Sequence, residues 1–190
     1  MNYPNSIKSK IKNNIYYGNR GMDFEADINI TNEYYRNNDI AIIYKKPTPI
    51  TINRVDYISR TNAVIKEAHF KTPSTTDYNG IYKGKYIDFE AKETKLKSFP
   101  LSNIHNHQIE HLKKITNHGG IGFILVFFKV QNEVYLLFAE DLFNFIETKK
   151  RKSIPISFFK EKGYLINFKF NPRIDYLNVV NKICFKGDVL

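Results

Sequence analysis

The stretch TTDYNGIYKGKYIDFEAKET, residues 75–94, decides the fold because it joins two alternating segments through a tight turn. Lys83 and Gly84 stand between the segments, and glycine at the second position of a two-residue loop is typical of a β-hairpin. With this turn, Tyr82 pairs with Lys85, and each step away from the turn adds one further pair. The stretch therefore predicts two antiparallel strands in a fixed register.

The same register brings acidic side chains into opposition. Counting outward from the turn places Asp77 opposite Glu90 and Thr75 opposite Lys92, all on one face of the hairpin because strand side chains alternate. Asp88 shares this face, and the other face, which we expect to be the core, carries Ile87, Phe89 and Ala91. A bulge at either glycine would shift the pairing by one residue and separate the acidic groups.

Opposed carboxylates need compensation, because paired Cβ atoms lie about 4.5–5.5 Å apart and like charges at that distance destabilise a sheet. Two carboxylates with a hydroxyl or carbonyl oxygen form a hard site of the kind that Mg²⁺ takes. Lys92 would then point at whatever the metal holds, and an ammonium beside a phosphate stabilises developing charge. Asp77 and Glu90 are predicted to be indispensable, and Asp88 and Glu93 to be replaceable.

A plainer interpretation of the same residues stays open. Acidic and basic side chains often alternate along a strand that faces solvent, and in that case they have no chemical role. The hairpin pattern alone does not separate a metal site from an ordinary charged surface.

Two residues outside the hairpin offer further acidic or amide groups. Gln108 interrupts the apolar stripe of a helix predicted over 102–117, in which Ser102 or Asn103 caps the first turn. Its amide either satisfies backbone groups in the core or reaches the acidic site. Glu25 lies near the start of a helix predicted from 20 to 38, where it serves either the helix dipole or the same site.

The composition indicates a folded protein with a polyanionic partner. Its 190 residues include 29 Lys and Arg against 19 Asp and Glu, which gives a formal net charge of +10. Such an excess favours binding to nucleic acid through phosphate contacts. The longest apolar run, residues 121–128, is far below the roughly 20 residues that span a bilayer, so no membrane partner is expected. One cysteine and no signal peptide predict a cytoplasmic location.

The order of the remaining patterns predicts an α/β fold, with a single mixed central sheet flanked by helices. We expect residues 1–18 to form a basic flexible arm and 19–190 to form a single domain. Residues 45–74, with several prolines and scattered basic groups, are expected to form an excursion from that domain. Further elements are predicted as strands at 121–128 and 133–138 and a short helix at 139–147.

Some literal strings are misleading. GIY at 80–82 and YID at 86–88 are too close together for the GIY-YIG nucleases, and HNH at 105–107 lacks the dispersed residues of the HNH nucleases. Four histidines cluster in the same region, and a zinc site is the alternative that they raise. Because no cysteine lies nearby and no HExxH pattern is present, we instead expect DNA-backbone contacts or ordinary surface positions. The four residues are His105, His107, His111 and His118.

Taken together, several segments make the chain resemble the RecU family of Holliday junction resolvases, found in low-GC Gram-positive bacteria and mycoplasmas. The resemblance implies a restriction-endonuclease-like PD-(D/E)xK core with a protruding stalk, a homodimer, and symmetric Mg²⁺-dependent nicking of four-way junction DNA, with Mn²⁺ as a substitute. The segments that carry it are NRGMDFE (19–25), IAIIYKKPTP (40–49), AVIKEAHFKTPSTTDYNGIYKGKYIDFEAKET (63–94), FPLSNIHNHQIEHL (99–112) and PRIDYL (172–177).

The resemblance also implies roles for individual residues. Lys92 matches a lysine that assists the transition state, and Glu25 and Arg20 match a segment near the active site and DNA. The excursion at 45–74 matches the stalk, which enters the junction. The metal ligands implied are Thr75, Asp77, Glu90 and Gln108. The DNA-binding residues implied in the stalk region are Lys45, Lys46, Arg54, Arg60, Lys66 and Lys71.

The function expected on these grounds is a structure-specific endonuclease of homologous recombination and DNA repair, with recombinase and branch-migration proteins as partners. A non-catalytic protein that binds junctions, and remodels DNA or recruits recombination factors, is the alternative from another class. A restriction-type nuclease of the same fold with another target is the third.

Overall fold

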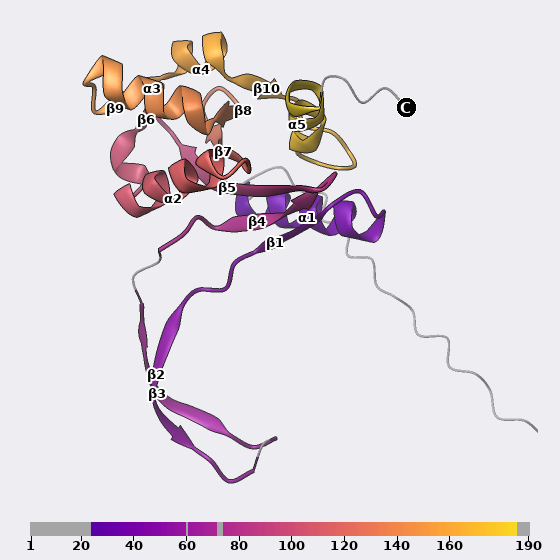
Figure 1. Cartoon of the computed structure of the whole chain (residues 1–190), viewed down its shortest axis with the longest axis vertical. Coiled ribbons are helices and arrows are strands. Elements are labelled where there is room, and N and C mark those ends of the chain that lie inside the picture. Colours follow the sequence, from indigo (N-terminus) through magenta and orange to yellow (C-terminus); the bar gives the residue numbers. More distant parts are fainter. Residues whose placement is uncertain (1–23, 60, 72–73, 186–190) are drawn as a thin grey trace, which may run out of the picture.

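The computed structural model describes residues 24–59, 61–71 and 74–185 (Figure 1). The basic arm expected at 1–18, together with Arg20 and Arg60, lies outside these residues. None of the described helices is long and apolar enough to cross a membrane.

The body of the molecule is built on one six-stranded sheet with strand order β1-β4-β5-β7-β8-β10. β5 and β7 are parallel, whereas every other neighbouring pair is antiparallel, so the sheet is mixed as predicted. The strands are β1 (Ile42–Lys45), β4 (Tyr78–Tyr82), β5 (Lys85–Thr94), β7 (Ile121–Phe128), β8 (Glu133–Phe138) and β10 (Tyr164–Ile166).

The hairpin of β4 and β5 has the predicted register. Tyr82 pairs with Lys85, and the ladder runs back to the pair of Tyr78 and Phe89. Lys83 and Gly84 both have positive φ, at 48° and 74°, as a type I′ turn requires. No bulge interrupts this ladder, so the acidic residues beyond its end keep their predicted order.

Helices cover both faces of the sheet (Figure 1). On one face lie α1 (Phe24–Asn37) and α5 (Tyr176–Cys184), and on the other α2 (Asn106–Asn117), α3 (Ala139–Lys149) and α4 (Ile156–Lys162). β7 is buried on both sides because its alternate residues enter different cores: Phe123 faces α1 and α5, whereas Ile124 faces the other layer. The flanked mixed sheet is the predicted architecture.

Aromatic side chains fill the core beneath α1 and α5. The ring of Phe89 stacks on Tyr78 and on Phe123, with 4.8 Å between ring centroids in each case, and lies 5.1 Å from Tyr176. The predicted stripe of α1 is fully buried against this core, from Phe24 through Ile28 and Thr31 to Tyr35. The apolar face of β5 is thereby anchored at the centre of the body.

The excursion is a two-stranded antiparallel hairpin of β2 (Ile50–Asp56) and β3 (Val64–Phe70), which forms a sheet separate from the central one. Figure 1 shows it projecting away from the body. Every residue of β3 is exposed, and so is all of β2 except its last residue. The stalk therefore has almost no core of its own.

Two local predictions were wrong. The helix expected from Ser102 begins at Asn106, because residues 101–103 form a 3₁₀ turn and His105 caps the helix, with Gln108 accepting a hydrogen bond from the His105 backbone. The C-terminal region holds a strand, β10, that was not predicted. The short strand β6 (Ser98–Pro100), ahead of α2, pairs with β9 (Ser153–Pro155), which lies between α3 and α4.

Gly80 provides a test of the packing of β1 on β4. A Cβ atom at this position would lie 2.0 Å from the backbone oxygen of Ile42, so Gly80→Ala must push the two strands apart. We expect it to lower the free energy of unfolding by about 1–3 kcal/mol. Lys85→Ala, at an exposed site on β5, should change the stability far less; equal losses in denaturant titrations would contradict the packing argument.

Candidate metal and nucleic-acid site

The acidic site lies where the start of β4 meets the second half of β5. The backbone N–H of Asp77 donates to Glu90 Oε2 at 3.1 Å. The Lys92 ammonium lies 2.6 Å from Glu90 Oε1 and 3.9 Å from Asp77 Oδ2. The structure thus brings together the two carboxylates and the lysine that the register placed on one face.

Glu90 is a buried acid with a partner on each oxygen. Its side chain is 0% exposed, and this burial, reinforced by the nearby Asp77 and opposed by Lys92, raises the pKa of Glu90 to about 8. Its Oε1 lies 2.6 Å from the Lys92 ammonium, and its Oε2 accepts from the Asp77 backbone. Carboxylate oxygens are the ligands that Mg²⁺ prefers, so the donor set of Glu90 and Asp77 fits that ion.

The other two implied ligands flank this pair and make contacts elsewhere. Thr75 is half-buried, and its hydroxyl donates to the backbone oxygen of Thr76 at 3.3 Å. Gln108 is buried on α2, and its Oε1 accepts from the His105 backbone at 2.9 Å. Of the two interpretations of Gln108, this hydrogen bond supports the backbone partner.

Asp88 contradicts the plainer interpretation, which placed its strand face in solvent. Its side chain is 0% exposed, and its replaceability stays a prediction. The physical reason is that α2 packs over this face of β5 and contributes His111, whose Nε2 lies 3.1 Å from Asp88 Oδ2. Periodicity within β5 gave no sign of this cover, because the helix comes from a later part of the chain. Glu93, by contrast, is exposed and pairs with Lys129 at 2.5 Å.

A groove of about 450 Å³ borders the acidic site on the side of α1. Glu25 and Lys92 both line it, together with Ser102, Asn103 and His105. Glu25 also contacts Lys45 of β1. The structure therefore places Glu25 beside the site, in a groove that approaches the lysine.

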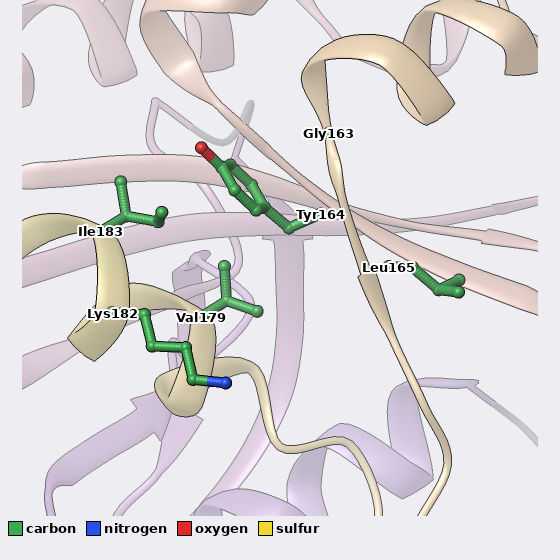
Figure 2. A pocket seen from close by; sticks show the side chains of 6 residues that line it. All are labelled: Gly163, Tyr164, Leu165, Val179, Lys182 and Ile183. Carbon is green, nitrogen blue, oxygen red and sulfur yellow. The ribbon is translucent and has the colours of Figure 1, made fainter.

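A larger cavity lies elsewhere, between β10 and α5, and sequence reasoning did not identify it. Its volume is about 590 Å³, and Figure 2 shows the α5 side chains that lie across from residues 163–165. The lining is mainly apolar and includes Tyr164, Val179, Lys182 and Ile183. It contains none of the acidic residues.

The histidine cluster does not form a zinc site in the described part of the chain, where no three His, Cys, Asp or Glu side chains gather as metal ligands. His105 and His107 stack on each other at 5.3 Å, and His118 contacts the backbone oxygen of Lys114. The Mg²⁺ ligands that the resemblance implies are of another kind, namely two carboxylates, a hydroxyl and an amide.

The basic residues assigned to the stalk region fall into two groups. Three of them are already paired with acids: Lys45 with Glu25, Lys46 with Asp88, and Lys66 with Asp56 at 3.4 Å. Arg54 and Lys71 are exposed on the stalk. Lys45 and Lys66 are exposed as well, so Lys46, which is half-buried, is the one least well placed to meet a phosphate backbone.

The site combines a buried acid and a lysine on a central strand with an opposing carboxylate. This combination makes the chain a candidate metal-dependent phosphodiesterase. The family model described as "Recombination protein U" matches residues 19–182. The chain belongs to this family, RecU.

Several relatives named "Holliday junction resolvase RecU" are similar over most of their length. The protein of Geobacillus sp. (strain WCH70) is 58% identical over 173 residues, covering 89% of this chain and 86% of the relative. That of Lactococcus lactis is 53% identical over 178 residues, covering 93% and 84%. That of Bacillus pumilus is 52% identical over 189 residues, covering 97% and 91%.

Among solved structures, Hjc of Archaeoglobus fulgidus, a Holliday junction resolvase, aligns with a TM-score of 0.46 and 12% identity, covering 75% of this chain and 93% of Hjc. At that level of similarity the likeness carries no argument about the site.

The buried Glu90 makes the stability of the metal-free protein depend on pH. Because its pKa rises from 4.5 in the unfolded chain to about 8 on folding, the folded state holds a proton that the unfolded state releases. The free energy of unfolding should therefore fall as the pH rises from 4.5 to 8. Glu90→Gln should flatten this fall and be the more stable protein at pH 8.

Denaturant titrations in a chelating buffer at pH 5 and pH 8 measure this effect. Glu93→Gln is the matched control and should retain the wild-type slope, because Glu90 is intact in it. Parallel slopes for wild type and Glu90→Gln would show that the buried carboxyl is not the source.

Proposed function

We propose that this RecU-family chain is a structure-specific endonuclease that resolves four-way DNA junctions by symmetric nicking, in homologous recombination and DNA repair. The observation that carries the proposal is the buried Glu90, with Asp77 opposed to it and the Lys92 ammonium at 2.6 Å. The names of relatives that are 52–58% identical support the same substrate. We place the protein in the cytoplasm.

Thr75, Asp77, Glu90 and Gln108 would hold Mg²⁺, with Mn²⁺ as a substitute. When bound, such an ion supplies a polarised phosphate and an activated water for in-line attack. Lys92 is positioned between the two carboxylates, so its ammonium can stabilise the charge that develops on the phosphate oxygens. Burial of Glu90 keeps bulk water from the carboxylate and strengthens these interactions.

The charge of the whole molecule complements this chemistry. A net charge of +10 draws the DNA toward a site whose own acidic groups would otherwise repel phosphates. The stalk projects from the same side of the sheet that carries β1 and β4 (Figure 1). Arg54 and Lys71 would contact the junction arms, and the groove beside Lys92 would accept the scissile strand.

Symmetric cleavage of two strands requires two active sites. A homodimer with twofold symmetry supplies them in matching orientations. Recombinase and branch-migration proteins are the partners that such an enzyme would meet on DNA.

The rival function is that of a protein that binds junctions without cutting them. The exposed stalk and the net charge would serve this function equally well. A pure binder, however, gains nothing from burying Glu90, which costs stability, beside an Asp77 carboxylate that repels phosphate. This pair favours the nuclease.

Asp77→Ala tests the two functions against each other. It removes one of the opposed carboxylates, and we expect Mg²⁺-dependent cleavage of a labelled four-way junction to be lost, with binding in the absence of Mg²⁺ retained. Glu161→Gln, at an exposed position of α4 away from the groove, should cleave like wild type. Cleavage by Asp77→Ala at the wild-type rate would end the assignment.

The choice of substrate separates a junction resolvase from a restriction-type nuclease. The purified protein should nick a mobile four-way junction with Mg²⁺, stop when the ion is chelated, and resume when it is restored. Linear duplex of the same sequence should stay intact. Equal cleavage of duplex and junction would support the restriction-type enzyme.

A further inference from the structure

Asp88 is a fully buried carboxylate to which neither the mechanism nor the resemblance gives a role. Its Oδ1 accepts a hydrogen bond from Thr76 Oγ1. Its Oδ2 lies 2.8 Å from Lys46 Nζ, 3.0 Å from the Tyr86 hydroxyl and 3.1 Å from His111 Nε2. Both oxygens are therefore occupied by protein groups, and Asp88 has no need of a metal.

The groups around Asp88 come from the segments that carry the implied metal ligands. Thr76 stands between the two ligands of the segment before β4, Thr75 and Asp77. Tyr86 lies on β5 with Glu90. His111 follows Gln108 by three residues on α2, which puts both on neighbouring positions of one helix surface. A single carboxylate thus joins all three ligand-bearing segments.

Lys46 tightens this arrangement from the end of β1. Its ammonium contacts Asp88 and also donates to Thr76 Oγ1 at 3.1 Å, and its backbone N–H donates to the Asp77 oxygen at 2.7 Å. Thr75 and Asp77 lie outside any strand, where backbone is more mobile than in a ladder. Their placement depends on the contacts of Lys46 and Thr76.

We propose that Asp88 is a positioning residue: through Lys46 and Thr76 it holds the segment that carries Thr75 and Asp77 against the strand that carries Glu90. This inference rests on the proposed nuclease function and deepens it. Ligands must stay within about 0.5 Å of their productive positions, and the contacts of Asp88 supply that constraint. It acts on the rate of cleavage and on the Mg²⁺ requirement, not on junction binding.

Asp88→Asn is the test, because it keeps the volume and removes the charge that holds Lys46. Single-turnover cleavage of a four-way junction should be about 10- to 100-fold slower than in wild type, and the Mg²⁺ concentration for half-maximal rate should rise. Junction affinity in a chelating buffer should be unchanged. Glu161→Gln, at an exposed position of α4 away from the groove, is the acidic control and should keep the wild-type rate and Mg²⁺ dependence.

A double-mutant cycle that combines Asp88→Asn with Lys46→Met shows whether Asp88 acts through the lysine. Each single variant should cleave the junction more slowly than wild type. The double variant should be no slower than the slower single variant, because both substitutions remove the same contact between Asp88 and Lys46. Lys46→Arg, which keeps the charge, should recover most of the rate. Losses that multiply in the double variant would mean independent roles and overturn the inference.

Circular dichroism and thermal unfolding separate positioning from folding. If Asp88→Asn melts earlier but cleaves like wild type at a temperature where it is folded, the role is structural only and the inference fails. Should this variant not fold, Thr76→Val removes the other end of the same link, and an unchanged rate would overturn the inference. A wild-type protein that cuts no junction would instead refute the proposed function.

Discussion

The register of β4 on β5 is the constraint on which the site depends. A two-residue turn with both residues at positive φ sets the register of the hairpin, so the turn fixes every pair back to Tyr78 and Phe89. Phe89 then stacks into the aromatic core, which holds β5 in place on its apolar side. With that side fixed, the acidic side chains of Asp88 and Glu90 must lie on the opposite face of the sheet.

Burial of acidic groups on that side has a physical consequence. A carboxylate out of water is costly unless it is paired and hydrogen-bonded, and the two buried acids of β5 meet this cost differently. Asp88 does so entirely within the chain, through Lys46, Thr76, Tyr86 and His111. Glu90 has fewer partners, the Lys92 ammonium and the Asp77 backbone N–H, and its burial raises its pKa. One strand thus holds an acid bonded on all sides within the chain and a second acid that is left with room for a cation.

Local chemistry decided what could be predicted from the sequence. The turn at Lys83 and Gly84, the opposition of Asp77 to Glu90, and the long apolar strand β7 depend on neighbours in the chain, and the structure has all three. The cover over Asp88 depends on α2, and the start of α2 depends on a cap at His105 that follows a 3₁₀ turn. β10, at three residues, is too short to show periodicity. The failures are therefore long-range contacts and short elements.

The root of the stalk is fastened on both sides of the sheet. Lys45 and Lys46 are neighbours in the chain, yet the first contacts Glu25 of α1 and the second contacts Asp88 beneath α2. A tilt of this root toward either layer would have to break one of these two side-chain contacts. A displacement of Lys46 would also act directly on the carbonyl of Asp77, to which its backbone N–H donates.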